Sequence, residues 1–145
     1  MAGTTRERAI SALFALLQKL PGLTTPSRRL TNPEGMDPTL SPALFLVCHQ
    51  DTTQRASSEH PPLRILQMRV LLYNDVGTDQ NAIPETPVNN LIDAIETLLL
   101  PNPLTGLQTL GGLVYHCFIE GDVVRSSGDI TGKSMAVVPV KIVLP

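Results

Sequence analysis

The sequence contains very few aromatic side chains. It has no tryptophan, two tyrosines and three phenylalanines, so aromatic residues make up only 3% of its 145 residues. Because aromatic rings bury the most surface in a typical core, the core predicted here must consist of leucine, isoleucine and valine. A subunit with such a core gains stability when packing in an assembly buries more of its surface.

An excess of charge of one sign is also missing. Eleven basic residues against thirteen acidic ones give a net charge of -2. Proteins that grip nucleic acid or anionic membranes usually carry a basic surface, so we expect no membrane binding and only passive contact with DNA. The 42% of hydrophobic residues and 17% of charged residues are typical of a folded chain rather than a disordered one.

Long hydrophobic runs are absent as well. No run approaches the roughly 18 apolar residues of a membrane span. Arg6 and Arg8 precede a short apolar run at residues 9–17, as in a signal peptide. However, Glu7 interrupts the basic segment, and polar residues follow where a small-residue cleavage site belongs. We therefore expect neither a signal peptide nor a membrane span.

Cysteine is scarce, with Cys48 and Cys117 the only two. Two are too few for a disulfide scaffold, and each lies in an apolar run, so both are predicted to be buried, reduced thiols in a reducing compartment. The pairs Cys48-His49 and His116-Cys117 suggest halves of a zinc site. Adjacent residues of a strand point to opposite faces, so each strand offers one ligand to a given face, whereas structural zinc needs four. We therefore expect no metal site.

No complete catalytic or nucleotide-binding motif occurs. Residues 128–134 read GDITGKS, but a phosphate-binding loop needs four residues between its glycines and a helix after them. Here Ser127 stands where the first glycine belongs, and a strand pattern follows Ser134. No G-x-S-x-G nucleophile motif is present, and the carboxylates of Glu120 and Asp122 resemble solvated loop acids. We expect no enzymatic activity and no cofactor.

Two helices are predicted from apolar residues at helical spacing. The first begins at a capping-box pattern formed by Thr4 and Glu7 and ends at Pro21; its apolar stripe is Ile10, Leu13, Leu16, Leu17 and Leu20. The second begins with Thr86 as its cap and Pro87 in its first turn. Pro101 ends it, and its stripe is Val88, Leu91, Ile92, Ile95, Leu98 and Leu99.

Two strands are predicted in the middle of the chain. The continuous apolar run at residues 42–49 predicts a strand covered on both faces. Alternation at residues 63–74 predicts a longer strand, with Leu66, Met68, Val70 and Leu72 facing the core.

The last third predicts a β-hairpin. Its arms are residues 112–126 and 134–144, with the turn at 127–133, and Pro139 indicates that the second arm is an edge strand or carries a bulge. Thirteen prolines, nearly twice the roughly 5% of average usage, indicate short elements and stiff loops. The order of elements predicts one α+β domain over residues 1–145, with two helices packed on an antiparallel sheet of about four strands.

Two polar segments are candidates for partner contacts. Residues 51–62 form a predicted loop of about a dozen residues, a length at which loops usually have a function; its candidate residues are Asp51, Thr53, Gln54, Arg55 and Glu59. Arg28 and Arg29 form the only adjacent basic pair in the sequence. They either protect an exposed edge strand or hold a partner's carboxylate in a bidentate pair.

The order of segments resembles that of phage tail terminator (tail completion) proteins. The resemblance covers nearly the whole chain. Its most specific pieces are PALFL at residues 42–46, the second helix at 89–99, QTLGGLVYH at 108–116 and VVPVKI at 137–142. None of them is a catalytic motif.

This resemblance implies a structural virion protein of a long-tailed bacteriophage. Tail terminators form a homo-oligomeric ring, usually of six copies, that sits on the last ring of tail-tube protein and halts tube polymerisation. The ring presents a surface to the head connector or neck protein, and genome DNA passes through without specific binding. The implied location is the virion, with assembly in the host cytoplasm.

Two alternatives from other classes remain open. A head–tail adaptor or another minor tail protein would share the size and the loops. A small nucleotide-binding module is a more remote alternative, and it would need the GDITGKS segment to bind phosphate.

Overall fold

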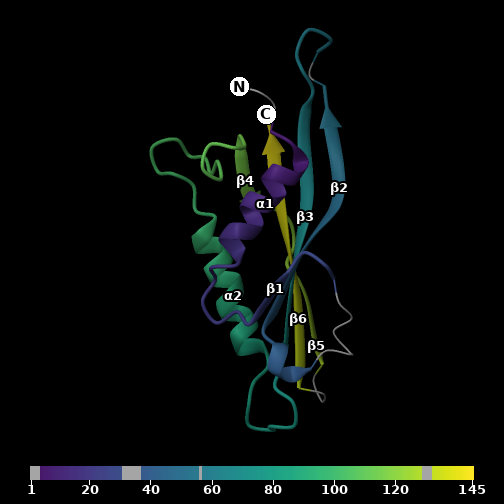
Figure 1. The fold of residues 1–145 in the computed structure, drawn as a ribbon, viewed down its shortest axis with the longest axis vertical. Helices are drawn as coiled ribbons and strands as arrows, with labels where there is room; N and C mark the ends of the chain where they lie inside the picture. The colour runs from purple at the N-terminus through teal and green to yellow at the C-terminus, as the bar shows by residue number, and fades with distance from the viewer. Residues whose placement is uncertain (1–3, 31–36, 56, 129–131) are drawn as a thin grey trace.

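Two α-helices pack on one face of a sheet (Figure 1). The computed structural model describes residues 4–30, 37–55, 57–128 and 132–145. The helices are α1 (Arg6–Leu17) and α2 (Glu85–Leu98), and a short 3-10 helix, η2 (Pro38–Leu40), precedes the second strand. The strands are β1 (Thr25–Ser27), β2 (Ala43–Gln54), β3 (Leu63–Asp75), β4 (His116–Ile119), β5 (Val124–Gly128) and β6 (Lys133–Leu144).

The sheet is larger and more mixed than predicted. Its order is β1-β2-β3-β6-β4, and β5 pairs with β6. β1 runs parallel to β2, whereas the other pairs in the described residues are antiparallel. The predicted α+β fold is confirmed, but the prediction of a purely antiparallel sheet of about four strands is wrong. The extra strands are β1, only three residues long, and a division of the arm predicted at residues 112–126.

The core lies between the helices and the sheet. The alternation predicted in β3 is confirmed, because Leu66, Met68, Val70 and Leu72 are all buried in the cluster that includes residues of α1 and α2. β6 supplies the matching row from the neighbouring strand: Ala136, Val138, Val140, Ile142 and Leu144. We call the opposite side of the sheet, which carries the other side chains of β3 and β6, the open face.

A bulge divides β2 into two halves. Ala43–Leu46 are all buried, as the apolar run predicted, but the strand continues to Gln54 with mostly exposed side chains. The register shifts between Cys48 and Gln50, so His49 has no opposite residue in β3. Because one extra residue exchanges the faces of a strand, even-numbered residues face the helices before His49, and odd-numbered residues do so after it.

A second irregularity separates β4 from β5. Ile119 lies opposite Val140 and Val124 lies opposite Val137, so residues 120–123 face only two residues of β6. Pro139 is one of these two, and its carbonyl accepts a hydrogen bond from the amide of Glu120. Proline has no N–H to donate, and the donor that Pro139 lacks would lie on the same side of β6 as its carbonyl, the side that faces the break. The extra residues thus lie in the facing segment and not in β6, whose register with β3 is continuous. β6 also lies inside the sheet rather than at its edge, so the predicted edge position is wrong.

The first helix begins one residue later than predicted. Thr5 is its N-cap, and the Thr5 side chain accepts a hydrogen bond from the Arg8 amide. The Thr4 hydroxyl instead donates to the Leu113 carbonyl at 2.6 Å, and the Glu7 carboxylate accepts from the Ser11 hydroxyl at 2.8 Å. The predicted capping box is wrong because both of its side chains have more distant partners.

The second helix, in contrast, starts earlier than predicted. Pro84 is its N-cap, and no side chain caps it; Thr86 and Pro87 lie inside the first turn. Most of the predicted stripe is buried: Val88, Leu91, Ile92, Ile95 and Leu99. Neither this helix nor any other helix in the described residues is long and apolar enough to span a membrane.

The GDITGKS segment connects two strands. β5 ends at Gly128 and β6 begins at Lys133, whereas residues 129–131 lie outside the described residues. Ser134 is buried in β6, so a strand occupies the position where a phosphate-binding loop needs a helix. The carbonyl of Gly132 accepts a hydrogen bond from the Val76 amide at 2.9 Å, which ties this connection to the end of β3.

Candidate interaction surface

The Arg28 guanidinium holds a carboxylate of its own chain. One of its terminal nitrogens donates to Glu7 Oε2, and the other donates to Glu7 Oε1 at 3.0 Å. This bidentate pair, together with the Ser11 hydroxyl, lowers the pKa of Glu7 to about 2, and Glu7 in turn raises the pKa of Arg28. The fork geometry matches the prediction, but the partner in this structure is α1 rather than another protein.

Arg28 and Arg29 follow β1 rather than forming an edge strand. β1 ends at Ser27, and the Ser27 hydroxyl bonds the Arg29 backbone, which turns the chain here. The Arg29 side chain is exposed, with no polar partner among the described residues. Of the two arginines, Arg29 is therefore the one available for an intermolecular contact, and its role in such a contact stays a prediction.

The first four residues of the predicted loop at 51–62 belong to strand β2. Asp51, Thr53 and Gln54 belong to β2, because the hairpin pairing continues to Gln54 opposite Leu63. The Asp51 carboxylate accepts from Arg6 Nε at 2.6 Å, which joins β2 to α1. The connecting loop is shorter than predicted, and its described residues are 55 and 57–62.

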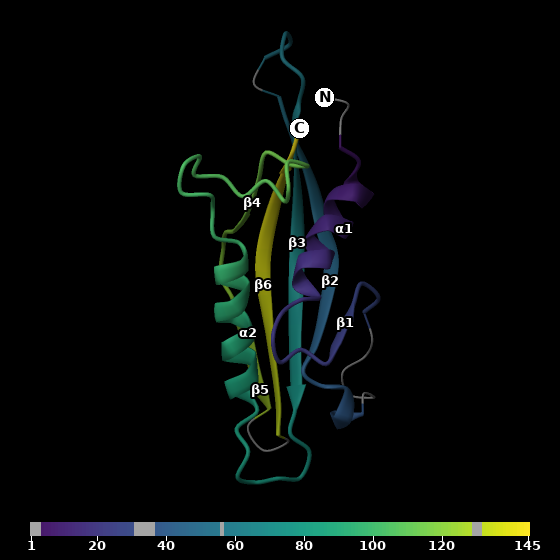
Figure 2. The same cartoon turned by 60° about the vertical axis from the view of Figure 1, so that its left-hand side comes forward.

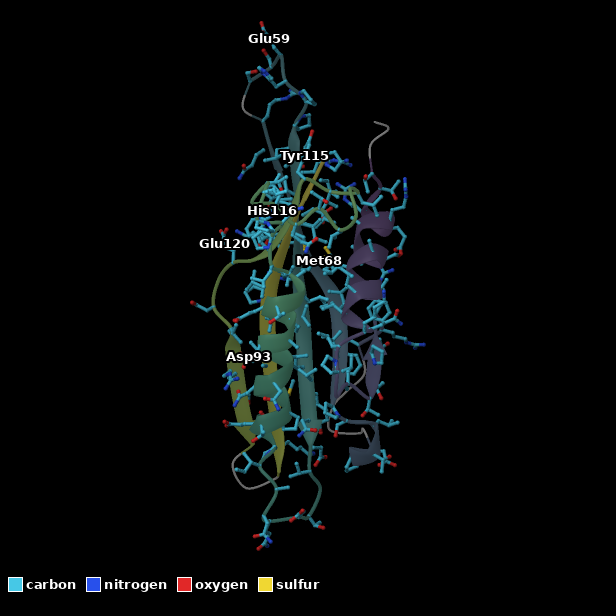
Figure 3. All side chains as sticks on the ribbon, turned by 90° about the vertical axis from the view of Figure 1, so that its left-hand side faces the viewer. Glu59, Met68, Asp93, Tyr115, His116 and Glu120 are labelled. Atoms are coloured by element: carbon cyan, nitrogen blue, oxygen red, sulfur yellow. The ribbon has the colours of Figure 1, made fainter. Side chains whose placement is uncertain are left out.

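The end of the β2–β3 hairpin projects beyond the rest of the molecule (Figure 1). Glu59 lies near its tip (Figure 3). Arg55 and Glu59 are exposed, as are Thr53 and Gln54 below them. Within the tip, the Ser57 hydroxyl and His60 Nδ1 are 2.6 Å apart. The hairpin tip, residues 55 and 57–62, is positioned to reach a neighbouring molecule, and the contacts of these residues stay a prediction.

The open face carries a charged depression of about 390 Å³ at the break between β4 and β5. Its charged and titratable lining residues are His49, Arg69, Glu120, Asp122 and Lys141. Lys141 Nζ donates to Glu120 at 2.9 Å, and Arg69 contacts His49 Nε2 at 3.1 Å. Lys141 and Glu120 compensate each other's charge, whereas the contact between Arg69 and His49 compensates none, so the depression contains one ion pair.

An uncharged segment between α2 and β4 forms a second projection. Residues 97–115 include no charged side chain, and Figure 2 shows this segment extending sideways beyond the end of α2. It contains four of the nine large hydrophobic side chains that are exposed in the described residues: Leu100, Leu104, Leu107 and Tyr115. Leu104 is 93% exposed. We call residues 100–107 the Leu104 loop.

Hydrogen bonds to Asn102 close the Leu104 loop. The Asn102 carbonyl accepts from Thr105 at 3.2 Å and from Gly106 at 2.7 Å, and the Asn102 amide donates to the Leu107 carbonyl at 2.9 Å. The Asn102 side chain accepts from the Leu104 amide at 2.8 Å. These four bonds hold the turn that presents the Leu104 side chain, so its exposure is built into the fold.

Gln108 fastens the base of the Leu104 loop. Its side-chain amide donates to the carbonyls of Leu98 and Leu100 at 3.4 and 3.2 Å, and its side-chain oxygen accepts from the Leu110 amide at 3.1 Å. The Leu98 carbonyl is one of those that the end of an α-helix leaves without a partner. The Gln108 carbonyl also accepts from the Cys117 amide in β4 at 2.8 Å, which links loop, helix and sheet.

Sequence reasoning missed the Leu104 loop. The leucines between residues 98 and 113 recur every three to four positions, which suggests a continued helical stripe. Prolines at 101 and 103 and glycines from 106 onward prevent a helix. The signal for an exposed apolar loop was a leucine-rich segment that has no charged residue and cannot form a helix. The leucines of such a segment cannot all reach the core.

The two predicted thiols have different environments. Cys117 is buried, and burial raises its pKa to about 12. Cys48 is exposed in β2, so the prediction that it is buried is wrong, although partial desolvation still raises its pKa. β2 and β4 have β3 and β6 between them, so the two Cys-His pairs are not neighbours.

The whole-chain fold matches a solved structure. A chain from the virion of a native gene transfer agent (GTA) particle aligns with a TM-score of 0.57 at 9% sequence identity. The alignment covers 93% of this chain and 92% of that chain. No protein-family model matches the chain, and no curated protein matches it. At this identity the likeness shows a common fold.

Proposed function

We propose that this protein is a non-enzymatic structural subunit of a tailed-phage virion, and that it forms a six-membered ring that terminates the tail tube. The observation that carries the proposal is the fold shared, over nearly the full length of both chains, with a component of a phage-like virion particle. Within this class, the segments that resemble tail terminators support the terminator role. Assembly takes place in the host cytoplasm.

The exposed surfaces of the chain support a role in assembly. A ring subunit on a tube must contact two neighbours, the tube and the head-side connector, and a closed head-to-tail ring uses two different patches on each subunit. The hairpin tip and the Leu104 loop are two separate exposed features of one small chain. No catalytic step is needed for such a role.

The charge of the chain agrees with a channel for DNA. A net charge of -2 avoids the tight phosphate contacts that a basic surface makes. In the proposed ring, DNA passes through without specific binding.

A tube-length assay tests the proposal. Tail-tube protein from the same genome is polymerised alone, with this protein, or with heat-unfolded protein as a control. We expect substoichiometric amounts to shorten the tubes, because each ring stops growth at one end, and capped tubes to join connector-bearing heads. Unchanged tube length would exclude the terminator role, and binding to heads without tubes would identify a head–tail adaptor instead.

A further inference from the structure

The Leu104 loop has the properties of a preformed contact. An exposed leucine on a mobile segment loses conformational entropy when it binds, whereas the four hydrogen bonds of Asn102 already hold this turn. Prolines on both sides of Asn102 further limit the backbone. No charged side chain lies between residues 97 and 115, so docking of the loop desolvates no charge.

A complementary apolar depression lies elsewhere on the same chain. It has a volume of about 520 Å³ and lies where the turn after α1 and the start of β2 meet the first half of α2. Its lining residues, all uncharged, are Pro21, Gly22, Pro42, Pro87, Asn90 and Leu91. Leu91 is buried at 2% exposure, and the prolines are stiff, so this depression is also preformed. We call it the proline pocket.

We propose that the Leu104 loop of one subunit docks into the proline pocket of the next copy of this chain. The loop follows the C-terminal end of α2, and the pocket includes Pro87 and Asn90 near its N-terminal end. Since a helix of this length separates the two features by roughly 15 to 20 Å, the loop cannot fill the pocket of its own chain.

Two different patches on one chain form a head-to-tail contact. Repetition of this contact around an axis produces a closed ring. The inference therefore rests on the proposed ring and identifies one of its subunit contacts. Leu104 supplies the apolar side chain, and the proline pocket supplies an uncharged surface of matching chemistry.

Disulfide trapping tests the contact directly. In a Cys48→Ser background, Leu104→Cys is combined with Asn90→Cys at the rim of the pocket, and the full-length protein is oxidised mildly. We expect a ladder of covalent oligomers from the double variant. Val124→Cys, which replaces an exposed apolar residue on the open face (62% exposed), is the matched control for Leu104→Cys and should yield no ladder with Asn90→Cys.

Sedimentation equilibrium of uncrosslinked variants supplies the second readout. Leu104→Ser should weaken self-association roughly 10- to 100-fold, the range expected when a leucine side chain is no longer buried. Val124→Ser should leave self-association unchanged. Both variants should melt like the parent protein, because neither side chain belongs to the core.

The outcomes separate this contact from the proposed function. If Leu104→Ser still caps tubes and the double variant gives no ladder, the docking is wrong and the terminator role is unaffected. A specific ladder without tube capping would support the docking and contradict the terminator role. Equal ladders from the Leu104 and Val124 variants, or no self-association of the parent protein at any concentration, would overturn the docking.

Discussion

Replacement of Gln108 by alanine should loosen the base of the Leu104 loop. The substitution removes three side-chain hydrogen bonds, to Leu98, Leu100 and Leu110. A neutral hydrogen bond contributes about 0.5 to 1.5 kcal/mol net. Because two of these bonds are long, at 3.4 and 3.2 Å, and the bond to Leu100 is exposed, the low end applies. We expect a loss of about 1 to 2 kcal/mol in the free energy of unfolding.

Urea denaturation and hydrogen exchange together measure this effect. With a slope of about 1.5 kcal/mol per molar urea, the unfolding midpoint should fall by about 1 M. The amides of Asn102 and Gly106, which bond within the loop, should exchange at least about tenfold faster because the loop opens locally. Gln67→Ala is the control, since it removes one side-chain bond, to Thr52, at a distance from the loop.

The pattern of exchange decides whether Gln108 fastens the loop. The Asn102 and Gly106 amides could keep their protection from hydrogen exchange in Gln108→Ala while the urea midpoint of unfolding falls. Gln108 would then stabilise the folded core without fastening the loop. The Leu104 loop would then not be held in place from its base.

Three further predictions follow from the described contacts. At neutral pH one thiol, Cys48, should react with a thiol reagent in the native protein, and Cys117, with a pKa of about 12, should react only after unfolding. The pKa of Glu7, lowered from 4.5 to about 2, means that its ion pair stabilises the fold above about pH 4.5 and loses this effect as pH falls toward 2; Glu7→Gln should reduce the acid dependence of the melting temperature between these values. Gly132→Ala should cost about 1 to 3 kcal/mol, because φ is +72° and the new Cβ would lie 2.9 Å from a backbone oxygen. Gly22→Ala, with φ of +79° and open space, should cost less in the same denaturation assay.

Periodicity predicted the elements that pack against each other. β3 has one face in the core, and its bounds differ from the prediction by a single residue. The stripe of α2 is buried as expected. Both predictions were possible because a strand or helix that buries one face has apolar residues at a regular spacing in the sequence.

Irregularities of the backbone could not be predicted in the same way. The bulge at His49 exchanges the faces of β2, and the break opposite Pro139 divides one predicted arm into β4 and β5. Pro139 signalled the break, but nothing local signalled the bulge. Three-residue β1 depends on pairing with β2 across the chain, so its own sequence carries little information.

The candidate contacts depend on partners that are distant in sequence. Arg28 looked like a free basic residue until the fold brought it to Glu7, 21 positions away. Asp51 likewise has Arg6 as its partner. The partner contacts of Thr53, Gln54, Arg55 and Glu59 stay a prediction. Leu104, the most exposed of the large hydrophobic side chains described, lies among leucines whose spacing resembles a core stripe.

The most direct test of the terminator role is averaged electron cryomicroscopy of tail tubes assembled with this protein. We predict a closed ring with six-fold symmetry at one end of each capped tube, with no tube subunits beyond it. A two-fold dimer at the tube end, or copies attached along the side of the tube, would contradict the proposed function.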